Sequence, residues 1–322
     1  MSKPTLCMLE GIPASGKSTL ARHIDINEYA MCVVDKEVQN ENIVIHSSDD
    51  LRQELFGDVN EQTKNNELFR ELHRRIRRDL QRGKHVIYDA TNINKKERCA
   101  FLRELNGIDC KKVCVMVFAD VRQCIEMNQK RERKVPDFVI ERQYKNFQPA
   151  HYSEGFDEIY ITFTRPYDYD RAKYNLATLF GRIDSFDQQN KHHDSTLGGH
   201  CRLAYAYVKE KFPKNTNLHI AALLHDIGKE FTQSKLNSRG VDDGDCHYYN
   251  HHCVSAYESA FYLCEMGLQI HDEVDIMSLI YYHMHPYMSW RSEKAMARDK
   301  ERLGEDFFND VMRLHEADEN AH

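Results

Sequence analysis

Residues 11–18 read Gly-Ile-Pro-Ala-Ser-Gly-Lys-Ser and follow a short apolar run at residues 6–9. This is the pattern GxxxxGK[ST], in which glycines let backbone N–H groups point at phosphate oxygens. The stretch predicts a strand, a phosphate-binding loop and a helix whose positive N-terminal end faces the phosphates. Lys17 would reach the β and γ phosphates of ATP, and the Ser18 hydroxyl would ligate Mg²⁺. We expect nucleotide contacts from Gly11, Ser15, Gly16, Lys17, Ser18 and Thr19.

Apolar runs and helical stretches alternate on either side of this loop, from residue 5 to residue 165. Strands separated by helices imply a parallel sheet with crossover connections, and near-continuous apolar runs fit strands that are buried on both faces. Residues 26–41 have no recognisable pattern. We predict strands at 6–9, 42–46, 85–89, 112–119 and 158–163, and helices at 17–24, 61–81, 95–105, 121–131 and 136–147.

The pattern changes near residue 166, where apolar residues begin to recur at helical spacing. No further strands are expected. We therefore predict an α/β P-loop domain at residues 1–165 and an all-α helical bundle at 166–322, with residues 166–190 as a linker or helical lead-in. The predicted helices of the second domain are 196–211, 217–228, 250–267, 273–285 and 305–319.

Composition narrows the functional classes. The 322 residues carry a net charge of −7, which argues against a protein that coats nucleic acid by bulk attraction. No apolar run approaches the roughly 20 residues that span a bilayer, so no membrane partner is expected. Ten scattered cysteines without a CxxC pair indicate reduced thiols. A strand that begins so near Met1 leaves no room for a signal peptide, so we expect a cytoplasmic protein.

Charged residues follow the predicted strands at the edge where a parallel sheet binds ligands. The second strand is followed by Ser47-Ser-Asp-Asp-Leu-Arg52, in which a carboxylate could accept an acceptor proton while Arg52 holds an acceptor phosphate. The alternative is that Ser48 or Asp49 caps a helix. Asp89 ends the third strand and would orient the Mg²⁺ and Lys17 neighbourhood, unless it caps the helix that begins near Asn94.

Two basic segments lie further along this half. Residues 128–136 (Asn-Gln-Lys-Arg-Glu-Arg-Lys-Val-Pro) have the composition of a lid whose arginines close on a transferring phosphoryl group. Residues 70–84 contain six arginines and a lysine, which are either a track for a polynucleotide or a solvated helix face.

Residues 4–150 resemble the kinase domain of phage and bacterial polynucleotide 5′-kinases. The resemblance rests on Ser-Asp-Asp-Leu-Arg52, Asp89-Ala-Thr-Asn and the Asn-Gln-Lys-Arg…Val-Pro lid. It implies Asp49 as the general base for a 5′-hydroxyl, Arg52 on the 3′ phosphate of the acceptor and Arg131 on the γ-phosphate. This lid has Glu132 where a glycine commonly follows the arginine, so Arg133 is the alternative lid arginine.

Histidines concentrate in the second half, with 13 of the 18 from His192 onward. Enrichment at one end suggests a metal site, and nitrogen and oxygen ligands without thiolates suit Mn, Fe, Co, Ni or Zn. Adjacent His225 and Asp226 could reach one metal only at a helix end or kink, which Gly228 would permit. His247, His252 and His285 are weaker candidates. The ligand candidates on separate predicted helices are His200, His225, Asp226, His251, His283 and Asp318.

Residues 190–322 resemble the HD phosphohydrolase superfamily. The resemblance implies one metal on His200, His225, Asp226 and Asp318, and a second on His251 and His283, with Asp226 bridging. The extra histidine pair favours this dinuclear site over the alternative, a mononuclear one. Two metals would activate a hydroxide and clamp phosphate oxygens, Lys229 would stabilise the phosphoryl group, and His193 would contact substrate. The matching segments are Thr196-Leu-Gly-Gly-His200, His225-Asp-Ile-Gly-Lys229, Tyr249-Asn-His251, Tyr282-His283-Met and Ala317-Asp318.

Together the two halves are similar to bifunctional HD and polynucleotide-kinase end-healing enzymes, although here the kinase half comes first. The resemblance implies phosphorylation of 5′-OH ends, RNA more than DNA, and removal of 2′,3′-cyclic, 2′ or 3′ phosphates, with a ligase as functional partner. The alternative is a nucleoside or metabolite kinase fused to a nucleotide phosphohydrolase. A third reading is a regulatory protein with a degenerate HD site, which the complete set of ligand residues disfavours.

Overall fold

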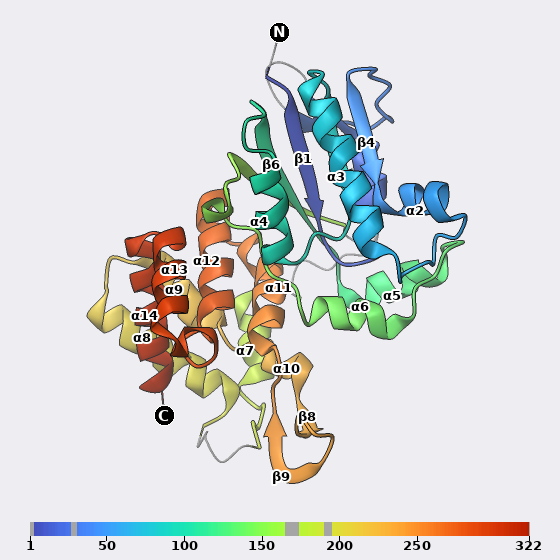
Figure 1. Ribbon diagram of the computed structural model, residues 1–322. Coiled ribbons are helices and arrows are strands. Elements are labelled where there is room, and N and C mark those ends of the chain that lie inside the picture. The colour runs from blue at the N-terminus through green and yellow to red at the C-terminus, as the bar shows by residue number, and fades with distance from the viewer. Residues whose placement is uncertain (1–2, 27–30, 165–173, 190–194, 322) are drawn as a thin grey trace. The chain divides into compact units, whose positions relative to one another are not determined.

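The computed structural model describes residues 3–26, 31–164, 174–189 and 195–321. It divides into two compact units, one of residues 1–143 and 150–166, the other of residues 144–149 and 167–322 (Figure 1). His193 and residues 166–173 and 190 of the predicted lead-in lie outside the described residues.

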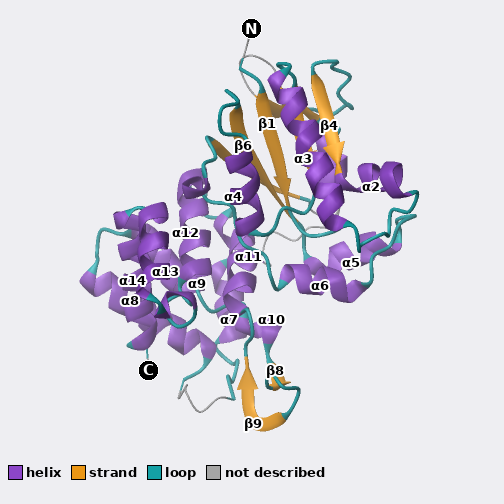
Figure 2. Ribbon diagram, viewed as in Figure 1, coloured by secondary structure: helices purple, strands orange, loops and turns teal. Residues whose placement is uncertain are grey.

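The first unit is built on a five-stranded sheet in the order β4-β5-β1-β6-β7, with every neighbouring pair parallel (Figure 2). The register places Leu9 and Ser47 each opposite Asp89, so β1, β4 and β5 end at one level. Ligand-binding residues of such sheets lie at this edge. The strands are β1 Thr5–Glu10, β4 Ile43–Ser47, β5 His85–Asp89, β6 Lys111–Phe118 and β7 Glu158–Phe163.

Helices connect these strands, as a parallel sheet requires. Helix α3 buries Leu68, Leu72, Ile76 and Leu80 at a spacing of four residues and packs against β4 and β5. The predicted α/β fold of this half is therefore confirmed. The helices are α1 Lys17–Ala21, α2 Ser48–Phe56, α3 Asn65–Gln81, α4 Lys95–Glu104, α5 Val121–Gln129 and α6 Asp137–Tyr144, whose last residue belongs to the second unit. A short 3-10 helix, η1, covers Tyr152–Glu154.

Two predictions for this unit were wrong. The helix predicted at 17–24 ends at Ala21, and Ile24–Ile26 forms a strand, β2, that pairs antiparallel with β3, Met31–Val33, inside the segment predicted to be irregular. Ile24 and Ile26 are both buried in the core with Asp25 between them, so burial follows the two-residue period of a strand. The helix predicted from residue 61 begins at Asn65.

The second unit is largely helical, as predicted. Every residue of α11 is buried, and the helix packs against α12; α9 lies between α8 and α12, and α14 covers α8. None of the described helices is long and apolar enough to cross a membrane. The helices are α7 Leu176–Ile183, α8 Leu197–Lys211, α9 Thr216–Leu224, α10 Lys229–Thr232, α11 His251–Leu263, α12 Ile270–Tyr282, α13 Glu293–Leu303 and α14 Glu305–Glu319.

The expectation that this half contains no strands was wrong. Strands β8, Ser234–Leu236, and β9, Asp242–His247, form an antiparallel hairpin around a turn in which Gly240 has a φ of 76°. Strand β9 is polar and mostly exposed, so its conformation comes from pairing and turn geometry, which hydrophobic periodicity cannot report. Helix α7 lies within the predicted lead-in, and helices α10 and α13 were not predicted.

Candidate functional sites

The phosphate loop between β1 and α1 requires glycine at two positions. A Cβ on Gly11 would lie 2.6 Å from the carbonyl oxygen of Val117. Gly16 has a φ of 94°, and a Cβ there would lie 2.5 Å from Oγ1 of Thr164, the hydroxyl that donates to the Ser15 carbonyl at 2.8 Å. Larger side chains would push the loop off the sheet edge, so the two motif glycines are required by close packing and by the left-handed backbone at Gly16.

The side chain of Lys17 lies within this loop. It is buried, and its Nζ donates to the carbonyl of Ile12 at 2.7 Å. Burial lowers the pKa of Lys17 to about 8, an effect that the charge of Asp89 opposes. Burial raises the pKa of Asp89, against the Ser18 hydroxyl that donates to it and the charge of Lys17. Lys17, Ser18 and Asp89 therefore form one group, and the helix that follows Asp89 is capped by Asn94 instead.

Asp49 lies in the first turn of α2, and Arg52 follows three residues later in the same helix. The cap is Ser47, whose Oγ accepts from the amides of Asp49 and Asp50, so the alternative in which Ser48 or Asp49 caps the helix is wrong. With the capping role filled by Ser47, the Asp49 side chain is available to other partners. It makes an ion pair with Arg133.

The Arg52 guanidinium is buried beside α3. Its Nη1 donates to the carbonyl of Glu61 at 2.6 Å and to Oδ1 of Asn65 at 2.8 Å. Burial lowers its pKa, and the charge of Asp49 opposes this. Its Nε is enclosed and has no acceptor among the described residues.

Asn128 closes the base of the predicted lid. Its fully buried amide donates to the Val135 carbonyl at 2.7 Å and accepts from the Val135 N–H at 3.0 Å. In the intervening loop Lys130, Arg131 and Lys134 are exposed, whereas Arg133 is partly buried against Asp49. Arg131 is exposed, and its charge contributes to the low pKa of Lys17.

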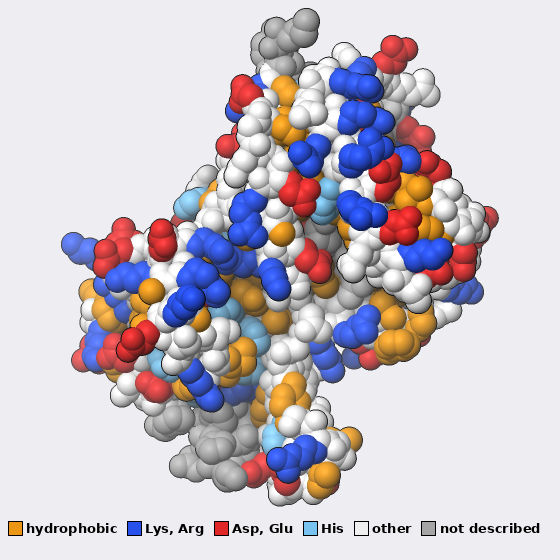
Figure 3. All heavy atoms as spheres, in the orientation of Figure 1, with side chains coloured by type: hydrophobic (Ala, Val, Ile, Leu, Met, Phe, Trp, Pro, Cys, Tyr) orange, Lys and Arg blue, Asp and Glu red, His pale blue; other side chains and the backbone are white. Residues whose placement is uncertain are grey.

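The basic run on α3 is largely paired. Arg74 bonds to Glu71, Arg75 bonds to Glu54 and Glu71, and Arg78 bonds to Asp79. Figure 3 shows acidic side chains among the basic ones on the first unit. At these positions the structure favours the solvated helix face over a polynucleotide track.

A buried ion network lies beneath the phosphate loop, and sequence reasoning missed it. Arg98 of α4 is bonded to Glu154 at 2.7 and 2.8 Å, and its Nη1 lies 3.2 Å from Glu10, the residue before the loop. The same guanidinium donates to the carbonyl of Asn92, whose amide bonds back to Leu9 at 2.8 Å. Arg98 thus ties the loop entrance to the segment after Asp89.

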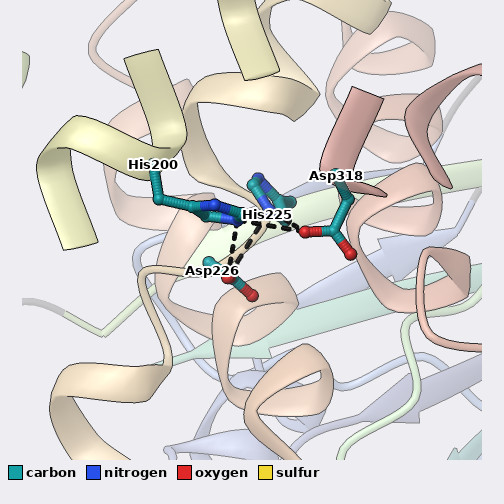
Figure 4. Close-up of side chains that lie close together, drawn as sticks. All are labelled: His200, His225, Asp226 and Asp318. Carbon is teal, nitrogen blue, oxygen red and sulfur yellow. Dashed lines mark hydrogen bonds and ion pairs between the residues drawn. The ribbon is translucent and has the colours of Figure 1, made fainter. Parts of the chain in front are cut away.

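In the second unit, the predicted metal ligands converge from separate elements (Figure 4). One group combines His200 of α8, His225 and Asp226 of the turn after α9, and Asp318 of α14. A second group combines Asp226 with His251, the first residue of α11, and His283, which follows α12. Within each group, the candidate ligand atoms lie within 4.8 Å of one another.

Asp226 belongs to both groups through different oxygens. Its Oδ2 lies 3.3 Å from Nε2 of His200 and 3.5 Å from Nε2 of His225. Its Oδ1 lies 3.1 Å from Nε2 of His251 and 3.6 Å from Nε2 of His283. A carboxylate placed in this way can bridge two cations.

Backbone carbonyls orient the four histidines. The Nδ1 atoms of His200, His225, His251 and His283 lie 2.6–2.9 Å from the carbonyl oxygens of Ala321, Ala222, Tyr248 and Ile280, respectively. A carbonyl only accepts, so each Nδ1 carries the proton and each Nε2 presents a lone pair in the neutral ring. Metal-bound histidines are held in this way.

The electrostatics of the histidine cluster also favour bound cations. The Nε2 atoms approach in pairs, at 3.2 Å for His200 and His225 and at 3.3 Å for His251 and His283. Two lone pairs at that distance repel unless a proton or metal ion lies near them. Burial lowers the pKa of His200, but Asp226 and Asp318 outweigh it and raise the pKa to about 10. The residues therefore fit a pair of divalent metal ions.

Gly228 holds the turn that carries His225 and Asp226 against α11. A Cβ there would lie 2.3 Å from the carbonyl oxygen of His251 and 2.5 Å from the amide nitrogen of Ser255. As predicted, the helix ends here, since α9 stops at Leu224 and α10 begins at Lys229. Gly228 has a helical φ of −65°, so the break does not depend on the left-handed conformation that glycine allows. The glycine permits close approach.

Further side chains surround the cluster. Lys229 lies 2.6 Å from Oδ2 of Asp226 and donates to Gln188 at 3.0 Å, above the ring of Tyr248. Tyr287 donates to Asp318 at 3.2 Å. Gln188, Tyr248 and Tyr287 had no signal in the sequence. Among the described residues, His247, His252 and His285 join neither metal-ligand group.

Comparisons with known proteins bear on the first unit. A family model described as an AAA domain matches residues 6–150, so this region is a P-loop kinase-like domain. No curated protein sequence matches the chain. Similar solved structures include a "putative kinase" from Chloroflexus aurantiacus J-10-fl, at 15% identity over 53% of this chain and 91% of that chain, with a TM-score of 0.40. A structure titled "Pnkp1/Rnl/Hen1 complex" has 18% identity over 66% of this chain and 68% of that chain, with a TM-score of 0.31.

Proposed function

We propose that the protein heals nucleic-acid ends, preferably of RNA. The first unit would phosphorylate 5′-hydroxyl ends from ATP, and the second would remove 2′,3′-cyclic, 2′ or 3′ phosphates. One chain contains both a phosphate loop, whose Lys17 senses the charge of Asp49, and a cluster of four histidines whose Nε2 atoms face one another. This combination is the observation on which the proposal rests. The products, a 5′-phosphate and a 3′-hydroxyl, are what a cytoplasmic ligase would consume.

In the kinase half, each residue has a distinct role. Lys17 and the loop amides bind the β and γ phosphates. Ser18 and Asp89 would hold Mg²⁺, which would supply positive charge beside the transferring phosphoryl group. Asp49 accepts the proton of the attacking 5′-hydroxyl, and Arg52 binds the acceptor phosphate. Arg131 closes on the γ-phosphate, a role supported by the effect of its charge on Lys17.

In the second half, His200, His225, Asp226 and Asp318 would hold one divalent ion, and His251 and His283 a second, with Asp226 shared. Such a pair of ions supplies a nucleophilic hydroxide and charge stabilisation. Lys229 is buried beside Asp226 and would donate to a phosphate oxygen. The carbonyls at the four Nδ1 atoms keep the ring nitrogens correctly oriented before substrate arrives.

A test of the kinase half is phosphoryl transfer from ATP to a 5′-hydroxyl oligonucleotide. Lys17→Ala should abolish the transfer, and Asp49→Asn should lower kcat by about 100-fold or more, as for loss of a general base. His225→Ala is the matched control and should phosphorylate normally. Undiminished transfer by Lys17→Ala would rule out this site as the kinase.

A test of the second half is metal-dependent hydrolysis of an RNA 2′,3′-cyclic phosphate, with Mn²⁺, Ni²⁺, Co²⁺, Fe²⁺ and Zn²⁺ supplied separately. Asp226→Ala should be inactive with every metal, whereas Lys17→Ala should retain full activity. Hydrolysis that persists in Asp226→Ala would show that the cluster is not the catalytic site.

A small-molecule kinase fused to a nucleotide phosphohydrolase is the second candidate. The paired arginines of α3 and the net charge of −7 favour a small acceptor over an extended polyanion. Oligonucleotide binding separates the two, because a polynucleotide enzyme should bind more weakly as salt rises, with a linear log–log slope. Absence of oligonucleotide binding at low salt, together with phosphorylation of free nucleosides, would select the second candidate.

A further inference from the structure

We propose that Arg133 binds the acceptor phosphate together with Arg52, and that the lid therefore contacts both substrates through different arginines. The inference rests on the proposed kinase function and assigns a substrate subsite within it. The ligand is the phosphodiester on the 3′ side of the first nucleoside of a 5′-hydroxyl acceptor. Arg131 would serve the γ-phosphate and Arg133 the acceptor.

The first observation is where the Arg133 side chain lies. Its Nη1 pairs with Oδ2 of Asp49, the proposed base for the acceptor hydroxyl. The side chain is only 19% exposed, although the loop that carries it is largely exposed. Arg133 therefore points to the acceptor side of the reaction.

The second observation is that two guanidinium groups lie close together with donors unused. The charges of Arg133 and Asp49 both act on the pKa of Arg52. The Nε atoms of Arg52 and Arg133 are both enclosed, and neither has an acceptor among the described residues. Buried donors without partners are costly, and a bound anion is one of the few arrangements that satisfies them.

The third observation separates Arg133 from Arg131. The charge of Arg131 affects Lys17, which lies in the phosphate loop, whereas the charge of Arg133 affects Arg52. The two arginines are two positions apart, and the intervening Glu132 is exposed. A loop in an irregular conformation can direct its arginines to the two substrates in this way.

The chemistry of a phosphodiester fits this pair. A guanidinium has five N–H donors in a planar fork, so Arg133 can hold Asp49 through Nη1 and a phosphate oxygen through Nε. Asp49 and Arg52, three residues apart in α2, lie on one face of the helix. A phosphate between the arginines would place the neighbouring 5′-hydroxyl near Asp49. The lid loop must lift to admit the acceptor.

The test compares two acceptors with the full-length enzyme and ATP. One is a 5′-hydroxyl oligonucleotide, and the other is the same oligonucleotide with a neutral methylphosphonate at the first linkage. For the native acceptor, Arg133→Ala should raise KM by about 10- to 100-fold, with the KM for ATP unchanged. For the methylphosphonate, Arg133→Ala and wild type should have equal KM values.

Three variants sharpen the comparison. Lys134→Ala removes the same charge from the neighbouring exposed position and should match wild type on both acceptors. Arg133→Lys keeps the charge without the fork and should give an intermediate KM. Arg131→Ala should lower kcat equally on both acceptors.

An equal loss on both acceptors in Arg133→Ala, or a raised KM for ATP, would overturn the assignment of Arg133 and leave the proposed function standing. A wild-type enzyme that phosphorylates neither acceptor would overturn the proposed function and this inference with it.

Discussion

Oδ1 of Asp226 lies 3.1 Å from Nε2 of His251, although the two residues belong to different elements of the helical unit. The other oxygen of the same carboxylate faces His200 and His225. A site for a single metal would need only one of the two Asp226 oxygens to face histidines. The use of both is the reason for expecting two ions.

Metal content should follow this division. His251→Ala removes a ligand of the second group only, so the purified protein loaded with Mn²⁺ and desalted should lose one of two equivalents. Asp226→Ala should lose both, because both groups share it. Inductively coupled plasma mass spectrometry measures the ratio. His247→Ala is the control, since that side chain bonds to Asp243 on the hairpin and should leave the content unchanged. A single equivalent in wild type would contradict the dinuclear assignment.

A methyl group at Gly228 should disturb the metal site by forcing apart α11 and the turn that carries His225 and Asp226. Gly228→Ala places a Cβ against backbone atoms of α11 that cannot rotate away, so the turn must shift. We expect a cost of roughly 1–3 kcal/mol and weaker metal binding. Gly181→Ala is the matched control, because a Cβ there meets nothing within 4 Å. Isothermal titration calorimetry with Mn²⁺ measures the metal affinity of both variants. Equal affinities in the two variants would refute the packing argument.

Removal of the Arg98 side-chain charge should destabilise the first unit specifically. Arg98→Met leaves the Glu154 carboxylate buried without its cation and removes the attraction that opposes the raised pKa of Glu10, at a cost of about 3–5 kcal/mol. Hydrogen exchange measured by mass spectrometry reports the two units separately. Amides of β1 should lose protection while those of α11 do not. Unchanged protection in β1 would mean that the network contributes little.

Protonation of Glu10 should make the free energy of unfolding of the first unit depend on pH. Burial raises the pKa of Glu10 from 4.5 to about 8, against the attraction of Arg98. Between these values the folded state binds more protons than the unfolded state, so the free energy of unfolding falls as pH rises. Glu10→Gln should flatten the decline between pH 5 and pH 8, as measured by β1 hydrogen exchange corrected for intrinsic rates. An identical slope in the variant would show that Glu10 is ionised throughout.

The parallel sheet was predictable because its signals are local. Strands such as β5 are apolar runs that end in a charged residue, and α3 has apolar residues at a spacing of four. The hairpin of β8 and β9 was not predictable, because its polar residues adopt a strand through pairing. Helix α7 lies within the predicted lead-in, but its bounds were not predicted, although Asn175 as its cap and its apolar face are readable in the sequence.

The candidate sites divide in the same way. His200, His225 and Asp318 could be chosen from residue type and motif, and the structure brings them together. Three of the carbonyls that orient the histidines lie three residues before them along the chain, and their role depends on turn geometry that residue types alone do not reveal. The fourth, that of Ala321, is 121 residues from His200, so no local signal could have pointed to it. Arg98 stands in the charged run Lys-Lys-Glu-Arg and looks like any solvated helix residue, although it is fully buried.

The most direct measurement uses one RNA that carries a 5′-hydroxyl and a 2′,3′-cyclic phosphate, incubated with ATP, Mg²⁺ and Mn²⁺ and resolved on a gel. The account predicts that wild type converts both ends, that Lys17→Ala converts only the 3′ end, and that Asp226→Ala converts only the 5′ end. An RNA left unchanged at both ends by a wild-type protein that phosphorylates free nucleosides would contradict it.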